Sequence, residues 1–210
     1  MRLAPRLLAM ALTSLATGVS AQESGGMPTM GAQAGAAAMR PPADSLRTNT
    51  QIRAYVAAVA EGTVPDLSGL DLQGLDLRGI DFRKASFTHA NLAGARLDST
   101  NLFSCDLTDA VAHGATFVGA NMDVSTLRRA DLRQADLHGA SLFATILEEA
   151  DLRGADLRNT RIIGYLRKAQ LAGARLNGAN IGADPGNQSM GVMRAQFVSA
   201  DLTGADLSDA

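Results

Sequence analysis

A strict five-residue period runs through most of this chain and constrains its fold more than any other feature. Twenty successive positions, five residues apart from Leu67 to Ile162, carry a large apolar side chain, with the single exception of Ala112. We name these positions the centres of the repeat. A period of five fits neither the 3.6-residue turn of an α-helix nor the two-residue period of a long flat strand. The chain must therefore change direction every five residues.

Each five-residue unit has an inward and an outward side. In Ala130-Asp131-Leu132-Arg133-Gln134, the alanine and the leucine lie two residues apart and share one face of an extended segment. The aspartate between them faces outward, and glycine often follows the centre by two residues, where a corner needs a positive φ. The units therefore predict coils that stack on one another and bury the centres along one axis. The predicted core includes Leu92, Leu97, Leu132, Leu137, Leu152 and Leu157.

These Ala-(Asp/Asn)-Leu-x-x units resemble those of the pentapeptide-repeat family over about residues 65–210. The resemblance implies an all-β fold, a right-handed quadrilateral parallel β-helix in which four units make one coil. The period alone does not give the number four. With four units in each coil, twenty units make five coils, which stack roughly 4.8 Å apart as neighbouring strands do. We expect this solenoid to extend over residues 63–210.

The period breaks at two places. After Ile162 the next centre is Leu166, so one residue is missing. After Ile181 the next centre is Phe197, well beyond one regular step, so the chain contains an insertion. With four units in each coil, both changes fall at the same corner. Residues 182–194 contain a turn signature, and we interpret them as a projecting loop with an apolar tip or flank, the alternative being a tolerated surface insertion.

A short helix is expected before the repeats, within residues 44–62. The sequence Thr48-Asn49-Thr50-Gln51 fits a capping box, and Gly62 and Pro65 are expected to stop the helix. Because so short a helix is marginal in water on its own, we expect its apolar face to cap the first coil. That face consists of Ile52, Tyr55, Val56 and Val59.

Residues 1–21 have the pattern of a secretory signal peptide. Arg2 and Arg6 form a basic start, a short apolar run follows, and Val19-Ser20-Ala21 supplies the small residues that a signal peptidase reads. The run is shorter than the roughly 20 residues of a spanning helix, so we expect a periplasmic or secreted bacterial protein without a stable membrane span after signal removal. A retained N-terminal anchor is the alternative.

Residues 22–43 are rich in Gly, Ala, Met, Gln and Pro and predict a disordered linker.

Composition argues against nucleic-acid binding. The net charge is −2, tryptophan is absent and aromatic residues make up 4% of the chain, so neither a basic surface nor a stacking platform is expected.

Some pentapeptide-repeat proteins protect DNA gyrase by imitating duplex DNA, which requires a strongly acidic rod in the cytoplasm. From residue 65 onward this chain has 14 Lys and Arg against 18 Asp and Glu, and it begins with an export leader. Gyrase protection is therefore the alternative function.

The sequence offers no convincing catalytic or metal-binding set, and no cofactor is expected. The three histidines, His89, His113 and His138, fall on different sides of a four-sided coil, and Cys105 occupies an inward position that alanine usually fills. Asp131 stacks one coil from another aspartate, which leaves an Asp-based metal-binding or enzymatic protein as a third hypothesis. Arginines stack beside these aspartates, however, and charge compensation is the simpler interpretation.

One outward row carries three large apolar residues beside two charged ones, Arg83 and Asp123. On the side of Ile162, the positions just after the centres include Phe103, Phe143 and Ile163. Three such residues on one wall predict either a partner-binding surface or a surface covered by another part of the chain. The candidate interaction surface comprises these three and the apolar residues of the loop: Phe103, Phe143, Ile163, Met190, Val192 and Met193.

The favoured function is therefore a non-enzymatic scaffold, secreted or periplasmic, that binds an unidentified protein partner. No helix follows Leu207 in the sequence, so the final coil lacks an evident cap. An uncapped coil exposes strand edges, and two such ends can meet about a two-fold axis. A homodimer through the C-terminal coil is a further expectation.

We predict that export removes residues 1–21 and leaves a mature chain beginning at Gln22. The basic start, the short apolar run and the small residues before the cut motivate this prediction. Intact-mass measurement of the exported protein should show the loss of this leader. Recovery of the full-length chain from the cytoplasm would contradict the proposed location.

Overall fold

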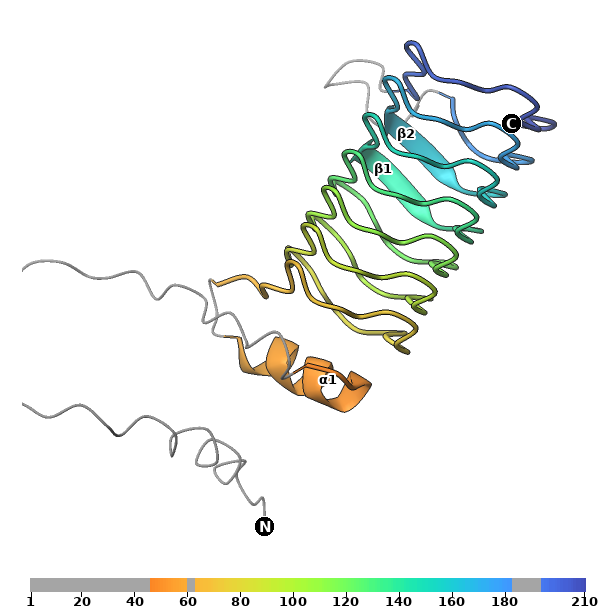
Figure 1. Ribbon diagram of the computed structural model, residues 1–210. Coiled ribbons are helices and arrows are strands. Elements are labelled where there is room, and N and C mark those ends of the chain that lie inside the picture. The colour runs from red at the N-terminus through yellow and green to blue at the C-terminus, as the bar shows by residue number, and fades with distance from the viewer. Residues whose placement is uncertain (1–45, 60–62, 183–193) are drawn as a thin grey trace, which may run out of the picture. The chain divides into compact units, whose positions relative to one another are not determined.

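Parallel backbone bridges between residues 20 positions apart organise the repeat region. Asp66 pairs with Ser86, and Ser86 in turn pairs with Asp106. Each coil therefore contains four five-residue units, and successive coils stack in parallel as a β-helix (Figure 1). The structure is a computed structural model, and it describes residues 46–59, 63–182 and 194–210. The predicted signal peptide and linker lie outside these ranges.

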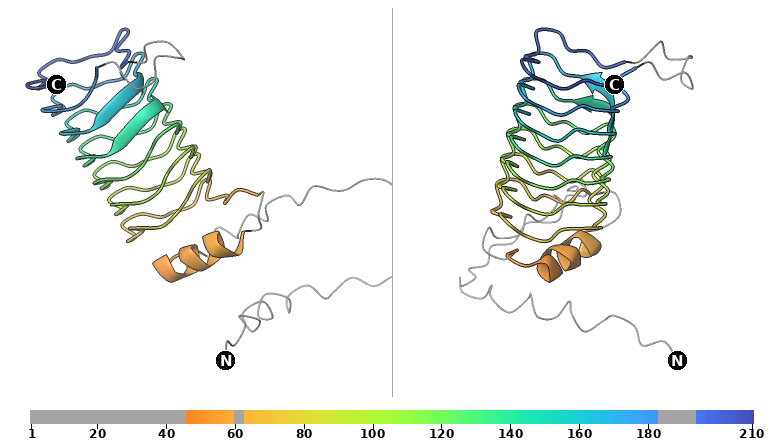
Figure 2. Two further views of the ribbon diagram at one scale, coloured as in Figure 1. Left: turned by 180° about the vertical axis from the view of Figure 1, so that it is seen from behind. Right: turned by 90° about the vertical axis from the view of Figure 1, so that its right-hand side faces the viewer.

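Regular elements are few because each extended segment is only a few residues long. The helix α1 spans Asn49–Ala58, and the strands β1 and β2 span Ser141–Ile146 and Arg161–Tyr165. The two strands belong to adjacent coils and pair in parallel, with Leu142 opposite Ile162. Figure 2 shows the same stack of coils from two further sides, with α1 beside the first coil. Most other units contribute one bridge residue and a two-residue turn.

The aspartate or asparagine before each centre has a structural role at the corner. In the unit around Leu132, Asp131 Oδ1 accepts a hydrogen bond from the backbone N–H of Arg133 at 3.2 Å. The N–H of Ala135 then donates to the carbonyl of Leu132 at 3.1 Å and closes the turn. Between them, Gln134 adopts a φ of 57°, a left-handed conformation for which glycine is the usual choice. Local hydrogen bonds of this kind explain why Asp and Asn recur in the repeat.

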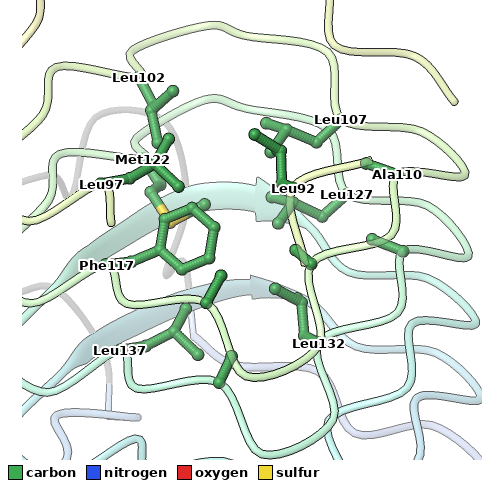
Figure 3. Close-up of a cluster of buried hydrophobic side chains, with 14 of the residues drawn as sticks. Leu92, Leu97, Leu102, Leu107, Ala110, Phe117, Met122, Leu127, Leu132 and Leu137 are labelled. Atoms are coloured by element: carbon green, nitrogen blue, oxygen red, sulfur yellow. The ribbon is translucent and has the colours of Figure 1, made fainter. Parts of the chain in front are cut away.

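The centres form a continuous apolar core along the axis of the coils. The six leucines expected in the core have no exposed surface, and Figure 3 shows four of them among their neighbours. The small residues that precede the centres are buried as well, for example Ala130 at 1% exposure. Each fully buried leucine contributes about 1.5–3 kcal/mol relative to an exposed one. Cys105 lies in the same core at 2% exposure.

The two breaks in the period appear as changed offsets between coils. Asp151 bridges Gln170, one position short of a regular coil, whereas Gln170 bridges Asp201, well beyond a regular coil. The first offset corresponds to the missing residue, and the second corresponds to the insertion. Most of the predicted loop, with its apolar residues Met190, Val192 and Met193, lies outside the described residues.

The missing residue is accommodated at Gly164 in β2. Phe143 lies opposite Ile163, and Ile146 lies opposite Tyr165, so the register shifts by one residue between these pairs. A Cβ atom at Gly164 would collide with the backbone carbonyl of Thr145. Glycine is therefore required here for close approach of two backbones rather than for a positive φ.

The helix α1 is shorter than the sequence indicates. Thr48 is its N-cap and accepts a hydrogen bond from the N–H of Gln51 at 3.3 Å, as the capping box predicts. The helix ends at Ala58, and Val59 has an extended ψ of 125°, so the predicted span of 44–62 is too long. The N–H of Val59 still donates to the carbonyl of Tyr55 at 3.2 Å, and the extended backbone of Val59 then ends the helix before Gly62 and Pro65.

Side chains of α1 contact backbone groups of the first coil. The Tyr55 hydroxyl accepts from the N–H of Asp66 at 2.9 Å, and Asn49 donates to the carbonyl of Asp76. Arg53 donates to the carbonyl of Arg78 at 2.5 Å. Three residues of α1, Ile52, Tyr55 and Val56, also pack on the core, and Ile52 has no exposed surface.

We predict that Gly164→Ala lowers the stability of the β-helix by about 1–3 kcal/mol or more, because the added methyl group overpacks a filled site. Gly182→Ala is the matched control, since the nearest atom to its Cβ would be Asn180 Oδ1 at 3.8 Å and neither glycine has a positive φ. Urea unfolding of both variants measures the difference. Equal stabilities would show that the strands can separate at Gly164 without cost.

Candidate interaction surface

The structure exposes only part of the predicted apolar row. Phe103 is 37% exposed and Phe143 is half-buried, whereas Ile163 is 1% exposed. Ile163 lies in register with Phe143 and is buried outside the hydrophobic core, which agrees with the second expectation, a surface covered by another part of the chain. One residue is missing next to Ile163, where Gly164 lies against the backbone of Thr145.

The row itself has Asp123 in the coil between Phe103 and Phe143, and Val124, in the adjacent column, is also exposed. It lies in the coil between Phe103 and Phe143, two residues after the centre, and it is 46% exposed. Its φ is 62°, a conformation that is uncommon and costly for a β-branched residue. The sequence feature that could have predicted its exposure is the valine itself, because glycine or a polar residue usually occupies this corner position. We name Phe103, Val124 and Phe143 the apolar wall.

Neighbouring polar groups hold the wall in position. The guanidinium carbon of Arg161 lies 4.2 Å from the centre of the Phe143 ring, a cation–π arrangement. Asp123 Oδ1 accepts from the N–H of Phe143 at 2.9 Å and from the Ser141 hydroxyl at 2.5 Å. These contacts fix the backbone and ring of Phe143 between adjacent coils.

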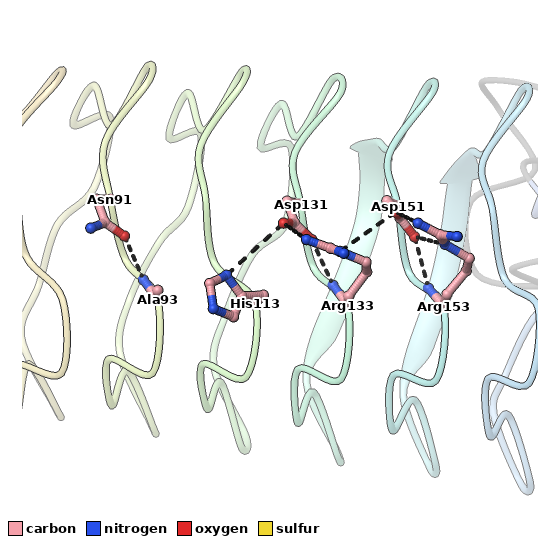
Figure 4. A network of polar contacts seen from close by, with 7 residues as sticks. All are labelled: Asn91, Ala93, His113, Asp131, Arg133, Asp151 and Arg153. Atoms are coloured by element: carbon pink, nitrogen blue, oxygen red, sulfur yellow. Dashed lines mark hydrogen bonds and ion pairs between the residues drawn. The ribbon is translucent and has the colours of Figure 1, made fainter.

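The stacked aspartates are engaged by arginines rather than available for chemistry. The Arg133 guanidinium donates two hydrogen bonds to Asp131, at 2.8 and 2.7 Å, and the Arg153 guanidinium binds Asp151 in the same way (Figure 4). The pKa of Asp131 is lowered, chiefly by the Arg133 guanidinium, and that of Asp151 is lowered chiefly by Arg153. A lowered pKa makes a carboxylate a weaker general base.

Opposite charges also alternate along one corner of the coils. His89, Asp109 and Arg129 succeed one another at intervals of one coil, and Glu149 and Lys168 continue the series. Asp109 binds Arg129 at 2.7 Å, and Glu149 binds Lys168 at 3.1 Å. These acidic residues are therefore compensated by basic partners, as are the stacked Asp131 and Asp151.

Cys105 does not have the properties of a nucleophile. Its sulfur donates to the carbonyl of Phe82 at 3.1 Å, and burial raises the pKa of the thiol to about 12. Reactive cysteines require an accessible thiolate.

Within residues 46–59, 63–182 and 194–210, no three His, Cys, Asp or Glu side chains are grouped so as to hold a metal ion. In the same ranges, no helix is long and apolar enough to cross a membrane.

Sequence comparison identifies the repeat itself. The profile described as pentapeptide repeats matches residues 66–102, 105–142 and 135–164, with eight copies of the repeat. No curated protein sequence matches the chain significantly.

Several solved structures are similar to this chain. A trypsin-treated variant of QnrB1, described as a plasmid-mediated fluoroquinolone resistance protein, is 19% identical over 69% of this chain and 79% of its own, with a TM-score of 0.38. A pentapeptide repeat protein from Nostoc PCC 7120 is 26% identical over 60% of this chain and 84% of its own, with a TM-score of 0.35. One from the Arabidopsis thaliana thylakoid lumen is 29% identical over 64% and 66%, with a TM-score of 0.15. None of these similarities assigns a function to this chain.

We predict that Arg133→Gln raises the pKa of Asp131 toward its ordinary value of about 4, because the main group that stabilises the carboxylate is removed. A carboxyl whose pKa is lower in the folded than in the unfolded state stabilises the fold above its unfolded pKa. This stabilisation is lost as the pH falls through the lowered value. NMR titration of the side-chain carboxyl carbon measures the shift. Arg83→Gln, which removes the partner of Asp81, should leave the pKa of Asp131 unchanged.

Proposed function

We propose that this chain, whose repeats belong to the pentapeptide-repeat family, is a non-enzymatic scaffold that binds another protein in the periplasm or outside the cell. The location rests on the signal-peptide pattern of residues 1–21. The observation that carries the binding function is the apolar wall of Phe103, Val124 and Phe143, which faces outward in three successive coils.

The wall has two properties of a binding surface. Its apolar groups are exposed where the same repeat elsewhere places Gly, Ser or charged residues, and Val124 keeps a strained backbone conformation there. The corners of this β-helix impose that conformation on whichever residue occupies them, and for a β-branched valine it carries a conformational cost. The wall is also preorganised, because backbone bridges join its coils and Arg161 holds the Phe143 ring. Preorganised groups lose little conformational freedom on binding.

Imitation of DNA is the less favoured function. It requires rows of negative charge that remain uncompensated, whereas Arg133 and Arg153 neutralise the stacked aspartates and Arg129 neutralises Asp109. Cell fractionation separates the two functions, since gyrase is cytoplasmic.

A pull-down from the periplasmic fraction tests the proposed function. The mature wild-type protein should retain a partner that the double variant Phe103→Ser, Phe143→Ser loses. Val111→Ser is the matched control, because Val111 is 38% exposed but lies away from the wall. Retention of the same partner by wild type and the double variant would show that the wall does not bind it.

We also propose that α1 acts as an N-terminal cap of a quadrilateral β-helix. The open backbone groups of a first coil are a surface for unwanted strand pairing, and Asn49, Arg53 and Tyr55 bind several of them. We predict that Ile52→Asp, which places a charge in the buried contact, lowers the melting temperature and causes aggregation. Ala57→Asp on the exposed face of α1 is the control. An Ile52→Asp protein that stays monomeric and equally stable would exclude a capping role.

A second copy of the chain is a further proposed partner, bound through the C-terminal coil. Leu207 is 37% exposed, whereas Leu176, one coil earlier, is fully buried. We predict that light scattering detects a dimer and that Leu207→Arg dissociates it, because a charge is costly in an apolar interface. A wild-type protein that is monomeric at high micromolar concentration would contradict this prediction.

A further inference from the structure

A groove lies at the ends of β1 and β2, on the side of the coils that follows the apolar wall in the chain. Its volume is about 260 Å³. The apolar part of its lining contains Ile146, Tyr165 and Val198, and Tyr165 and Val198 are 45% and 59% exposed. The polar part contains Arg128, Glu148, Arg167 and Gln196.

The apolar lining departs from the rest of this side of the coils. Parallel bridges align Ile146 and Tyr165 with Asp106 and Thr126 of earlier coils, which are polar. Val198 likewise follows its centre directly, the position that Thr108 has in an earlier coil. Exposed apolar residues are thus concentrated in the last coils of a side that is otherwise polar.

The charges beside these residues do not cancel. Glu148 lies between two arginines, with Arg128 2.8 Å from its Oε2 atom and Arg167 in contact with its Oε1 atom. The Glu148 side chain is 11% exposed, whereas the two arginines are 47% and 56% exposed. One carboxylate therefore faces two guanidinium groups, and one positive charge remains in excess.

The adjacent corner does not compensate for this excess. Arg129 is paired with Asp109 and Lys168 with Glu149, so each of these basic residues already has an acidic partner. The two guanidiniums of the groove still have solvent-facing donors, and arginine binds carboxylates through two parallel hydrogen bonds. The groove therefore attracts an anionic group next to an apolar one.

We propose that this groove docks an acidic segment of a partner protein, with an apolar side chain against Tyr165 and Val198 and a neighbouring carboxylate on Arg128 and Arg167. The excess positive charge of the groove favours a partner segment with negative charge. The volume of the groove is below the roughly 300–1,000 Å³ of small-molecule sites and suits one or two side chains of a protein. The inference goes beyond the proposed function, since the groove and the apolar wall are separate surfaces.

Selection from a random-peptide display library tests the proposal with the full chain as bait. Peptides enriched on the wild-type protein should place Asp or Glu beside a large apolar residue. Their affinity should fall as salt is raised, because exposed charges are screened. Enrichment of basic or uncharged peptides, or of none, would overturn the proposal.

Two sets of variants locate the binding site. Tyr165→Thr with Val198→Thr introduces the residue type of earlier coils, so the fold should persist, and the affinity of selected peptides should fall about tenfold, as for the loss of an interface anchor. Arg167→Gln should abolish the preference for acidic over neutral peptides. Arg153→Gln, at an arginine of similar exposure that pairs with Asp151, is the control.

A third comparison separates this site from the apolar wall. The double variant Phe103→Ser, Phe143→Ser should bind the selected peptides as the wild type does. The opposite result would overturn the proposal. If this variant loses peptide binding and the variant Tyr165→Thr with Val198→Thr keeps it, the peptides bind to the apolar wall and not to the groove. Circular-dichroism melting of every variant confirms that each comparison is made between folded proteins.

Discussion

Hydrogen bonding between successive coils is the constraint on which the rest of this structure depends. The N–H of Leu132 donates to the carbonyl of Asp151 at 2.8 Å, and the N–H of Gln134 donates to that of Arg153 at 3.1 Å. The same pattern recurs in unit after unit along the stack. Buried backbone groups must be paired, and here the pairs lie one coil apart in the chain. Each unit must therefore turn at the same corner as the unit one coil before it, so that the backbone groups of the two units stay paired.

This constraint turns the surface into columns. A side chain that points outward has as its nearest neighbours the residues one coil before and one coil after it. A column of like charges would therefore repel itself, and two arrangements in this chain reduce that repulsion: opposite charges alternate along a column, or they are paired across adjacent columns. Asp109 with Arg129 illustrates the first arrangement, and Asp131 with Arg133 illustrates the second. The same geometry lines up apolar residues when they recur, as Phe103 and Phe143 do.

One break in the repeat lies beside both of the distinctive surfaces. One residue is missing at Gly164, and the backbones of β1 and β2 approach each other closely there. Phe143 on one side and Tyr165 on the other belong to these two strands, and they contribute to the apolar wall and to the groove respectively. A regular coil leaves little room for specificity because each unit resembles the next. Departures from the repeat supply the shape and the apolar groups that recognition requires.

The sequence by itself determined which side chains point inward. The alternation within each unit is local, so the burial of Leu92 or Leu157 follows from the position of each residue in its own unit. The shortened and lengthened offsets between coils follow equally from counting along the chain from one centre to the next. Only the tertiary structure decided how far each outward residue is exposed. Ile163 is 1% exposed although it lies in register with the half-buried Phe143, whereas Val124 and Tyr165 are 46% and 45% exposed. Exposure depends on contacts between coils, and a pattern that repeats within one coil does not contain them.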